Sequence, residues 1–208
     1  MRRKLLQHIT IFLLLVASTA RAQENNFLER LIPRDFTVQY AGGIGMFSAG
    51  INYPMANNKL DLSFLYGHVP PKFGGKLNKI TTKFQYNPFD IRITENISLR
   101  PVNPVFFLSF TLNRNHHLIW PRDQYGAGYY WWNSAMRWHL GLSSEVRFHS
   151  FEKTIFSYVA AYIEANVQDM YLYARLDNPD YFTFYDVMYI GTGIRFGIKN
   201  PSRRHQEE

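Results

Sequence analysis

The sequence contains no cysteine, which excludes disulfide bonds and cysteine-based metal or catalytic sites. It also has no apolar run of about 20 residues, the length that a transmembrane helix needs. Its basic excess is small, because residues 1–22 carry four of the 23 basic residues and none of the 16 acidic ones, leaving 19 against 16 in the rest of the chain. A nearly even charge balance provides no strongly basic surface of the kind that binds nucleic acid. We therefore expect no nucleic-acid partner.

The N-terminus has the three parts of a secretory signal. Met1-Arg2-Arg3-Lys4 is positively charged, residues 9–17 are apolar, and Ala20-Arg21-Ala22 is a small-x-small cleavage site. The apolar part, about ten residues, is too short to span a membrane as a helix. The sequence therefore predicts a cleaved signal peptide and an exported protein.

The rest of the chain is rich in alternating polar and apolar residues, most clearly in the segment 136–149. Its apolar members are Met136, Trp138, Leu140, Leu142, Val146 and Phe148, and its polar members are Arg137, His139, Ser143, Glu145, Arg147 and His149. Because successive side chains of a strand point to opposite faces, the segment predicts a strand with one apolar and one ionisable face. Such strands are typical of membrane-spanning barrels, where one face meets lipid and the other a polar lumen.

Eight segments of this kind follow one another in the chain: 36–41, 46–55, 59–67, 77–87, 97–113, 136–149, 154–166 and 185–198. They predict an all-β fold, an eight-stranded antiparallel up-and-down transmembrane β-barrel with both termini in the periplasm. If residues 36–54 formed one long strand with a glycine bulge, only seven strands would cross the membrane. We favour the alternative, a hairpin that turns at residues 42–45. Pro101 and Pro104 predict a bulge or a break early in the fifth segment, since proline cannot donate to the strand ladder.

The segment 25–32 has apolar residues at helical spacing and ends before Pro33. It fits a short N-terminal amphipathic helix or an unstructured leader equally well. The predicted organisation is a signal peptide at 1–22, a periplasmic leader at 23–35, the transmembrane β-barrel at 36–199 and a polar C-terminal tail at 200–208.

Amphipathic aromatic residues with outward parity fall near both ends of the predicted strands. One ring comprises Tyr53, Tyr86, Phe148 and Phe196, and the other Tyr40, Tyr66 and Trp138. Two such girdles mark the interfaces of outer-membrane barrels. In architecture, and over the whole mature chain, the pattern resembles the small eight-stranded outer-membrane β-barrel proteins of Gram-negative bacteria, of the OmpA/OmpX type. Such barrels usually end on an aromatic residue, whereas a polar tail follows Phe196 here.

The resemblance implies an outer-membrane location, outer-membrane lipid and lipopolysaccharide as partners, and a monomer. Eight strands leave an interior just wide enough for side chains. The parity places charges of both signs inside, and they must pair, because an isolated buried ion is costly. The predicted lumen network comprises Asp61, Lys79, Lys83, Arg137, His139, Glu145, Arg147, Glu164 and Arg195. A plug of ion pairs is the favoured interpretation, and a narrow channel is an alternative.

Some barrels of this size are lipid-modifying enzymes, either lipid A acyl hydrolases or acyltransferases, and this activity is the other alternative. They use a histidine with a serine and a carboxylate. The weak catalytic candidates here are His139, Ser143, His68 and Asp123, but the chain has no His-x-Ser pair. We expect no metal and no cofactor.

The predicted 114–135 loop is unusually aromatic. It contains Trp120, Tyr125, Tyr129, Tyr130, Trp131 and Trp132. Such density indicates either a site for an extracellular ligand or the lipopolysaccharide surface, or an extension of the outer girdle. The sequence as a whole favours a non-enzymatic outer-membrane barrel with a structural or surface-interaction role.

Overall fold

A computed structural model of the chain describes residues 32–73, 77–113, 116–117, 134–149 and 154–199. By its contacts the chain divides into two compact units, Met1–Pro33 and Arg34–Glu208. The predicted signal peptide, nearly all of the predicted leader helix and the polar tail lie outside the described residues and stay predictions. The second unit contains every strand and helix described below.

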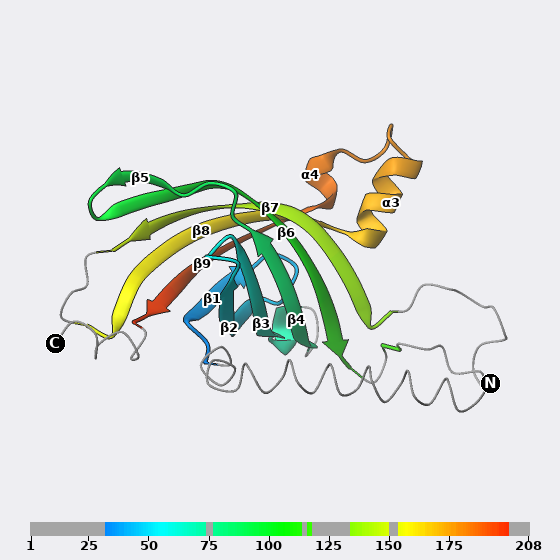
Figure 1. The fold of residues 1–208 in the computed structure, drawn as a ribbon. Helices are drawn as coiled ribbons and strands as arrows, with labels where there is room; N and C mark the ends of the chain where they lie inside the picture. Colours follow the sequence, from blue (N-terminus) through cyan, green and yellow to red (C-terminus); the bar gives the residue numbers. More distant parts are fainter. Residues whose placement is uncertain (1–31, 74–76, 114–115, 118–133, 150–153, 200–208) are drawn as a thin grey trace, which may run out of the picture. The chain divides into compact units, whose positions relative to one another are not determined.

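Nine strands in the described part of the chain form one antiparallel sheet, and eight of them close into a barrel (Figure 1). These eight are β1 (Asp35–Ala41), β2 (Phe47–Met55), β3 (Leu60–Val69), β4 (Leu77–Tyr86), β6 (Ile97–Leu112), β7 (Met136–Phe148), β8 (Phe156–Gln168) and β9 (Met188–Ile198). β1 pairs with β9, and β4 pairs with β6. The eight predicted strands and the all-β barrel are therefore confirmed.

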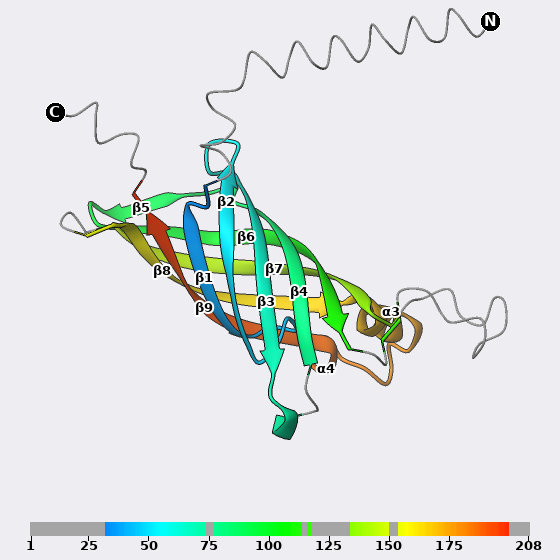
Figure 2. The same cartoon turned by 90° about the horizontal axis from the view of Figure 1, so that it is seen from below.

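The strands are strongly tilted, as closure of a small barrel requires. The tilt can be followed by stepping from each residue to its pairing partner on the next strand, starting at Asp35. The successive partners are Asn52, Ser63, Lys83, Phe107, His139 and Gln168. The series starts at the first residue of β1 and arrives at the last residue of β8. Figure 2 shows the resulting oblique course of the strands. We call the end at which β1 begins and β9 finishes the terminal end, and the opposite end the loop end.

The first hairpin exists as predicted: β1 and β2 pair through a short turn at the loop end. Ala41, Gly42, Gly43 and Gly45 all have positive φ. A side chain at Gly43 would lie 2.9 Å from the imidazole of His139, so the turn needs glycine there. The turn folds inward, and Ile44 is fully buried.

The predicted irregularity of the fifth segment is a β-bulge. Arg100 pairs with Glu145 and Asn103 with Ser143, so Pro101 and Val102 together face the single residue Ser144. The bulge reverses the parity of β6, because Ser98 and Arg100 point inward before it and Asn103 points inward after it.

Two connections contain structure where the sequence predicted plain loops. β5 (Ile91–Thr94) lies in the link before β6 and pairs with residues 97–99, because β4 pairs with β6 only from Val105 onward. The predicted 167–184 loop holds α3 (Asp169–Asp177). α4 (Phe184–Val187) begins at the end of this loop and covers the first three residues of the predicted strand 185–198, so β9 begins only at Met188. Both helices lie past the ends of β8 and β9 (Figures 1 and 2). A single 3-10 turn, η1 (Pro71–Phe73), follows β3.

Near the loop end, the buried side chains of Ile44, Leu65 and Phe107 form an apolar cluster. Ile44 comes from the inward turn, Leu65 from β3 and Phe107 from β6. This apolar layer lies across a lumen that is otherwise mostly polar.

Replacing Ile44 by alanine should therefore lower the free energy of unfolding by about 2–5 kcal/mol, the usual cost of deleting buried methyl groups. Leu176→Ala, at an α3 position that is 63% exposed, should cost under about 1 kcal/mol. Urea unfolding of the detergent-folded protein measures both. Equal losses from the two variants would show that the turn does not fill the lumen.

Candidate functional site: the polar lumen

The inner wall carries a nearly continuous set of buried polar and charged side chains. The buried charged residues are Asp35, Asp61, Lys83, Arg100, Glu145, Arg147, Glu164, Asp169 and Arg195. The alternation of the strands dictates this arrangement, because every second residue faces the interior of a closed sheet. Charges in that space need partners, since an unpaired buried ion costs several kcal/mol.

Asp61 and Arg195 form the centre of an ionic layer toward the terminal end. Arg195 Nη1 donates to Asp61 Oδ2 at 2.8 Å, and Asn87 Nδ2 donates to the same oxygen at 3.0 Å. Arg195 Nη1 also lies 3.4 Å from Glu145 Oε2, and Arg147 Nε donates to the other carboxylate oxygen of Glu145. The layer thus links β3, β7 and β9 across the lumen.

A second ion pair lies nearer the loop end. Lys83 Nζ donates to Glu164 Oε2 at 2.7 Å and to Gln39 Oε1 at 3.0 Å. The Tyr162 hydroxyl donates to the same Gln39 oxygen at 2.9 Å. Lys83 Nζ also lies 5.1 Å from the centre of the Phe107 ring, which places the pair against the apolar cluster.

His139 is fully buried next to the apolar cluster, on the loop-end side of both ionic groups. Its ring stacks on Phe107 with a centroid distance of 4.3 Å, and its Nδ1 lies 2.9 Å from Asn166 Oδ1. Asn166 Nδ2 donates to the carbonyl of Gly42, which leaves Oδ1 to accept from Nδ1–H. These contacts tie His139 to the inward turn.

The predicted network residues Lys79 and Arg137 lie at the loop end of the lumen and are only half-buried. Lys79 Nζ donates to the carbonyl of Gly43 at 2.7 Å, which holds the inward turn from a second side. Arg137 Nε lies 3.9 Å from Asp169 Oδ1 at the start of α3. All nine predicted network residues therefore face the interior, at different levels.

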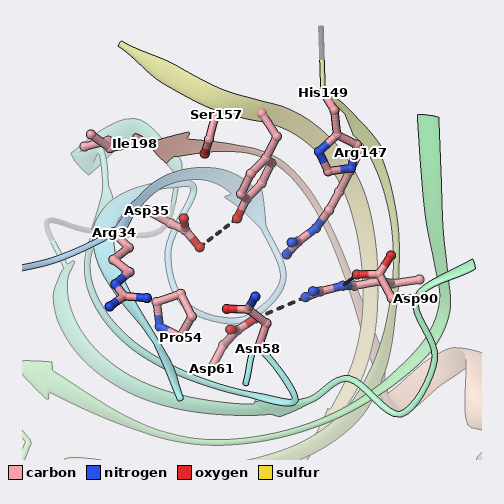
Figure 3. A pocket seen from close by; sticks show the side chains of 12 residues that line it. Arg34, Asp35, Pro54, Asn58, Asp61, Asp90, Arg147, His149, Ser157 and Ile198 are labelled. Atoms are coloured by element: carbon pink, nitrogen blue, oxygen red, sulfur yellow. Dashed lines mark hydrogen bonds and ion pairs between the residues drawn. The ribbon is translucent and has the colours of Figure 1, made fainter. Parts of the chain in front are cut away.

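At the terminal end the lumen opens into a cavity of about 350 Å³. Figure 3 shows charged side chains of both signs around it, among them Asp35, Asp90 and Arg147. Arg100 also lines the cavity, and sequence reasoning missed it. The signal was present in the alternation of Ile97, Ser98, Leu99 and Arg100, but the two prolines that follow hide it.

Among the described residues, the catalytic candidates His139 and Ser143 are not brought together. His139 and Ser143 both face inward on β7, but four residues of strand separate them by about 13 Å. His68 Nδ1 bonds to Asn78 Oδ1 at 2.8 Å. Asp123 lies outside the described residues, as do the aromatic residues at 120–132.

One hydroxyl–imidazole pair was not predicted: Ser98 Oγ lies 2.9 Å from His149 Nε2 at the terminal end. Partial burial, followed by the charge of Arg147, lowers the pKa of His149 below its usual value. Among the described residues no carboxylate is hydrogen-bonded to the ring, so a third catalytic partner is missing from this pair.

Within the described ranges, no cluster of three or more histidine, aspartate or glutamate side chains could hold a metal ion. None of the described helices is long and apolar enough to cross a membrane. No protein-family model matches the chain, and a comparison with curated proteins finds no match. The likeness to small outer-membrane barrels is therefore one of architecture alone.

The buried pair Lys83–Glu164 provides a test of the ionic lumen. Lys83→Met and Glu164→Met should each lower the free energy of unfolding by about 3–5 kcal/mol, because each leaves an unpaired buried charge. The double variant should recover much of this loss. As a control, Lys72→Met changes an exposed lysine of η1, and it should cost under about 1 kcal/mol. Simple additivity of the two methionine changes in urea unfolding would refute the coupling.

Proposed function

We propose that the chain is an integral outer-membrane β-barrel whose lumen is filled by side chains and conducts no solutes. Its role is structural, or is interaction with partners at the cell surface. The observation that carries the proposal is the inversion of its two faces: charged side chains are buried inside, and large apolar side chains are exposed outside. A water-soluble protein would expose the charges instead. Such an outer wall is suited to contact with the acyl chains of a lipid bilayer.

The outer wall is apolar on every strand of the barrel. Its exposed members include Phe36, Val38, Phe47, Phe64, Ile80, Phe84, Phe106, Leu140, Leu142, Ile163, Ile190 and Ile194. Soluble monomers rarely expose a contiguous apolar patch above a few hundred Å². A wall of this kind around a whole barrel favours a lipid environment.

Aromatic side chains lie near both ends of this wall. Tyr86 and Phe148 are exposed near the terminal end, and Tyr40, Phe47 and Tyr66 near the loop end. Tyr40 and Phe47 pair across β1 and β2 with ring centroids 5.4 Å apart. Amphipathic rings at both ends fit the two interfaces of a bilayer.

The loop end supports a surface-interaction role. The connection that holds α3 and α4 exposes several aromatic side chains: Tyr171, Tyr173, Tyr181, Phe182, Phe184 and Tyr185. Tyr181 and Tyr185 are each 85% exposed. Thr183 N and Oγ1 both donate to Asp186 at 2.7 Å, which lowers the pKa of that carboxyl and caps α4. Lipopolysaccharide or an extracellular ligand would be the partner.

The two alternatives have less support. The apolar cluster and the two ionic layers lie across the lumen, which argues against a channel. The catalytic candidates His139 and Ser143 are too far apart for the triad that a lipid hydrolase needs. We therefore retain the non-enzymatic, closed barrel as the proposal.

Single cysteines test the lipid-facing wall directly, because the chain has no native thiol. In vesicles, a nitroxide on Leu142→Cys, which is on the outer wall, should collide often with oxygen and rarely with a water-soluble nickel chelate. The reverse is expected for Tyr181→Cys, beyond the loop end. A nitroxide on Ser143→Cys, which faces the lumen, should be shielded from both relaxants. Nickel accessibility at Leu142 equal to that at Tyr181 would place the outer wall in water.

Conductance tests the closed lumen independently. In planar bilayers bathed in concentrated KCl, the folded protein should give no stable unitary current, because side chains fill the interior. A calibrated porin provides the positive control for insertion. A reproducible unitary step that disappears when the protein is omitted would overturn the closed-lumen part of the proposal.

A further inference from the structure

The cavity at the terminal end is lined by charged side chains, one of which keeps a buried donor without an acceptor. Its volume of about 350 Å³ falls within the usual range for ligand pockets. Its charged lining is balanced by count, with Arg34, Arg100 and Arg147 against Asp35, Asp61 and Asp90. The two sets differ in one respect: every carboxylate has a donor within the protein, whereas the buried Nη1 of Arg100 has no acceptor.

Each carboxylate of the lining already accepts a hydrogen bond from the protein. Tyr158 donates to Asp35 at 2.7 Å, and Arg195 donates to Asp61 at 2.8 Å. Arg100 Nε donates to Asp90 at 2.9 Å. Each of the three carboxylates therefore already has a donor within the protein.

The arginines keep free donors. Arg100 is 2% exposed, yet its Nη1 has no hydrogen-bond partner and lies 3.9 Å from the nearest paired carboxylate oxygen, Asp61 Oδ2. Arg147 donates through Nε to Glu145 and stacks on Tyr158 at 4.3 Å, so its terminal nitrogens stay available. Its guanidinium points into the cavity, and Arg34 lies at the rim (Figure 3). The Nη1 group of Arg100 lacks an acceptor, and an anion with several oxygens could supply one to both arginines.

We propose that this cavity is a binding site for a phosphate-type anion, held by Arg100 and Arg147 with Arg34 at its mouth. Guanidinium groups bind phosphate through paired N–H donors, and a tetrahedral oxyanion can accept from two arginines at once. Free phosphate, a small phosphate ester and a phospholipid headgroup share this chemistry.

His149 also lines this cavity. Partial burial and then the charge of Arg147 lower its pKa, whereas Asp90 raises it, and Arg92 and Arg100 lower it. Because the site lies inside the barrel mouth, it does not depend on the proposed membrane location, and the test can be made in detergent.

Titration calorimetry with inorganic phosphate at constant ionic strength measures the site in the detergent-folded chain. Arg100→Gln should weaken phosphate binding at least tenfold, because it removes the buried unpartnered donor. Asp90→Asn should tighten binding two- to threefold, since it removes a carboxylate that competes for Arg100. Lys72→Gln, a loop-end cation outside the cavity, is the matched control and should leave affinity unchanged.

A second measurement does not depend on the folding of the Arg100 variant. Phosphate should slow the modification of Arg100 and Arg147 by phenylglyoxal, as read by mass spectrometry, while a surface arginine such as Arg92 reacts at an unchanged rate. Arg34→Gln, at an exposed position, should weaken binding several-fold without loss of fold.

The two sources of phosphate are separated by titrating short-chain phosphatidylglycerol and glycerol phosphate beside free phosphate. Tighter binding of the lipid by at least tenfold assigns the site to a headgroup, and equal binding assigns it to a soluble anion. Either result supports the proposal. Absence of saturable binding by all three, or equal loss in Arg100→Gln and Lys72→Gln, would overturn it.

Discussion

Closure of the sheet by the β4–β6 pairing is the constraint on which the rest of the structure depends. Once the sheet is closed, every second side chain lies in the interior of the barrel, and every other one lies on the outer wall. The polar half of each strand is then forced to find partners inside the barrel. Asp61 with Arg195 and Lys83 with Glu164 are the result. The apolar half is exposed on the outer wall, which is the observation behind the proposed lipid environment.

The lumen is layered along the barrel, and each layer has a different physical character. The terminal end holds a cavity with free arginine donors, followed by the Asp61–Arg195–Glu145 layer and then the Lys83–Glu164 pair. The apolar cluster of Ile44, Leu65 and Phe107 lies nearer the loop end. The inward turn that contributes Ile44 is held by Lys79 and Asn166, so the polar network and the apolar layer stabilise each other.

The strands and the parity of the lumen could be predicted because alternation is a local property of the chain. The segment 136–149 reveals its faces without knowledge of its neighbours. β5 could not be predicted, because it pairs with the part of β6 that extends beyond the end of β4. Arg100 was missed for a related reason: the bulge at Pro101 reverses parity, so the inner face of β6 cannot be read through it. The partner of each ion inside the barrel depends on register and tilt, which sequence periodicity does not contain.

The orientation of the strands in a bilayer tests the central claim most directly. Polarised infrared spectroscopy of the protein in aligned bilayers reports the angle between the strands and the membrane normal through the amide I dichroism. A barrel whose outer wall is solvated by acyl chains should give strands tilted by about 35–45° and should resist extraction by alkaline carbonate. Strands lying in the plane of the membrane, or complete release by the alkaline wash, would contradict the account.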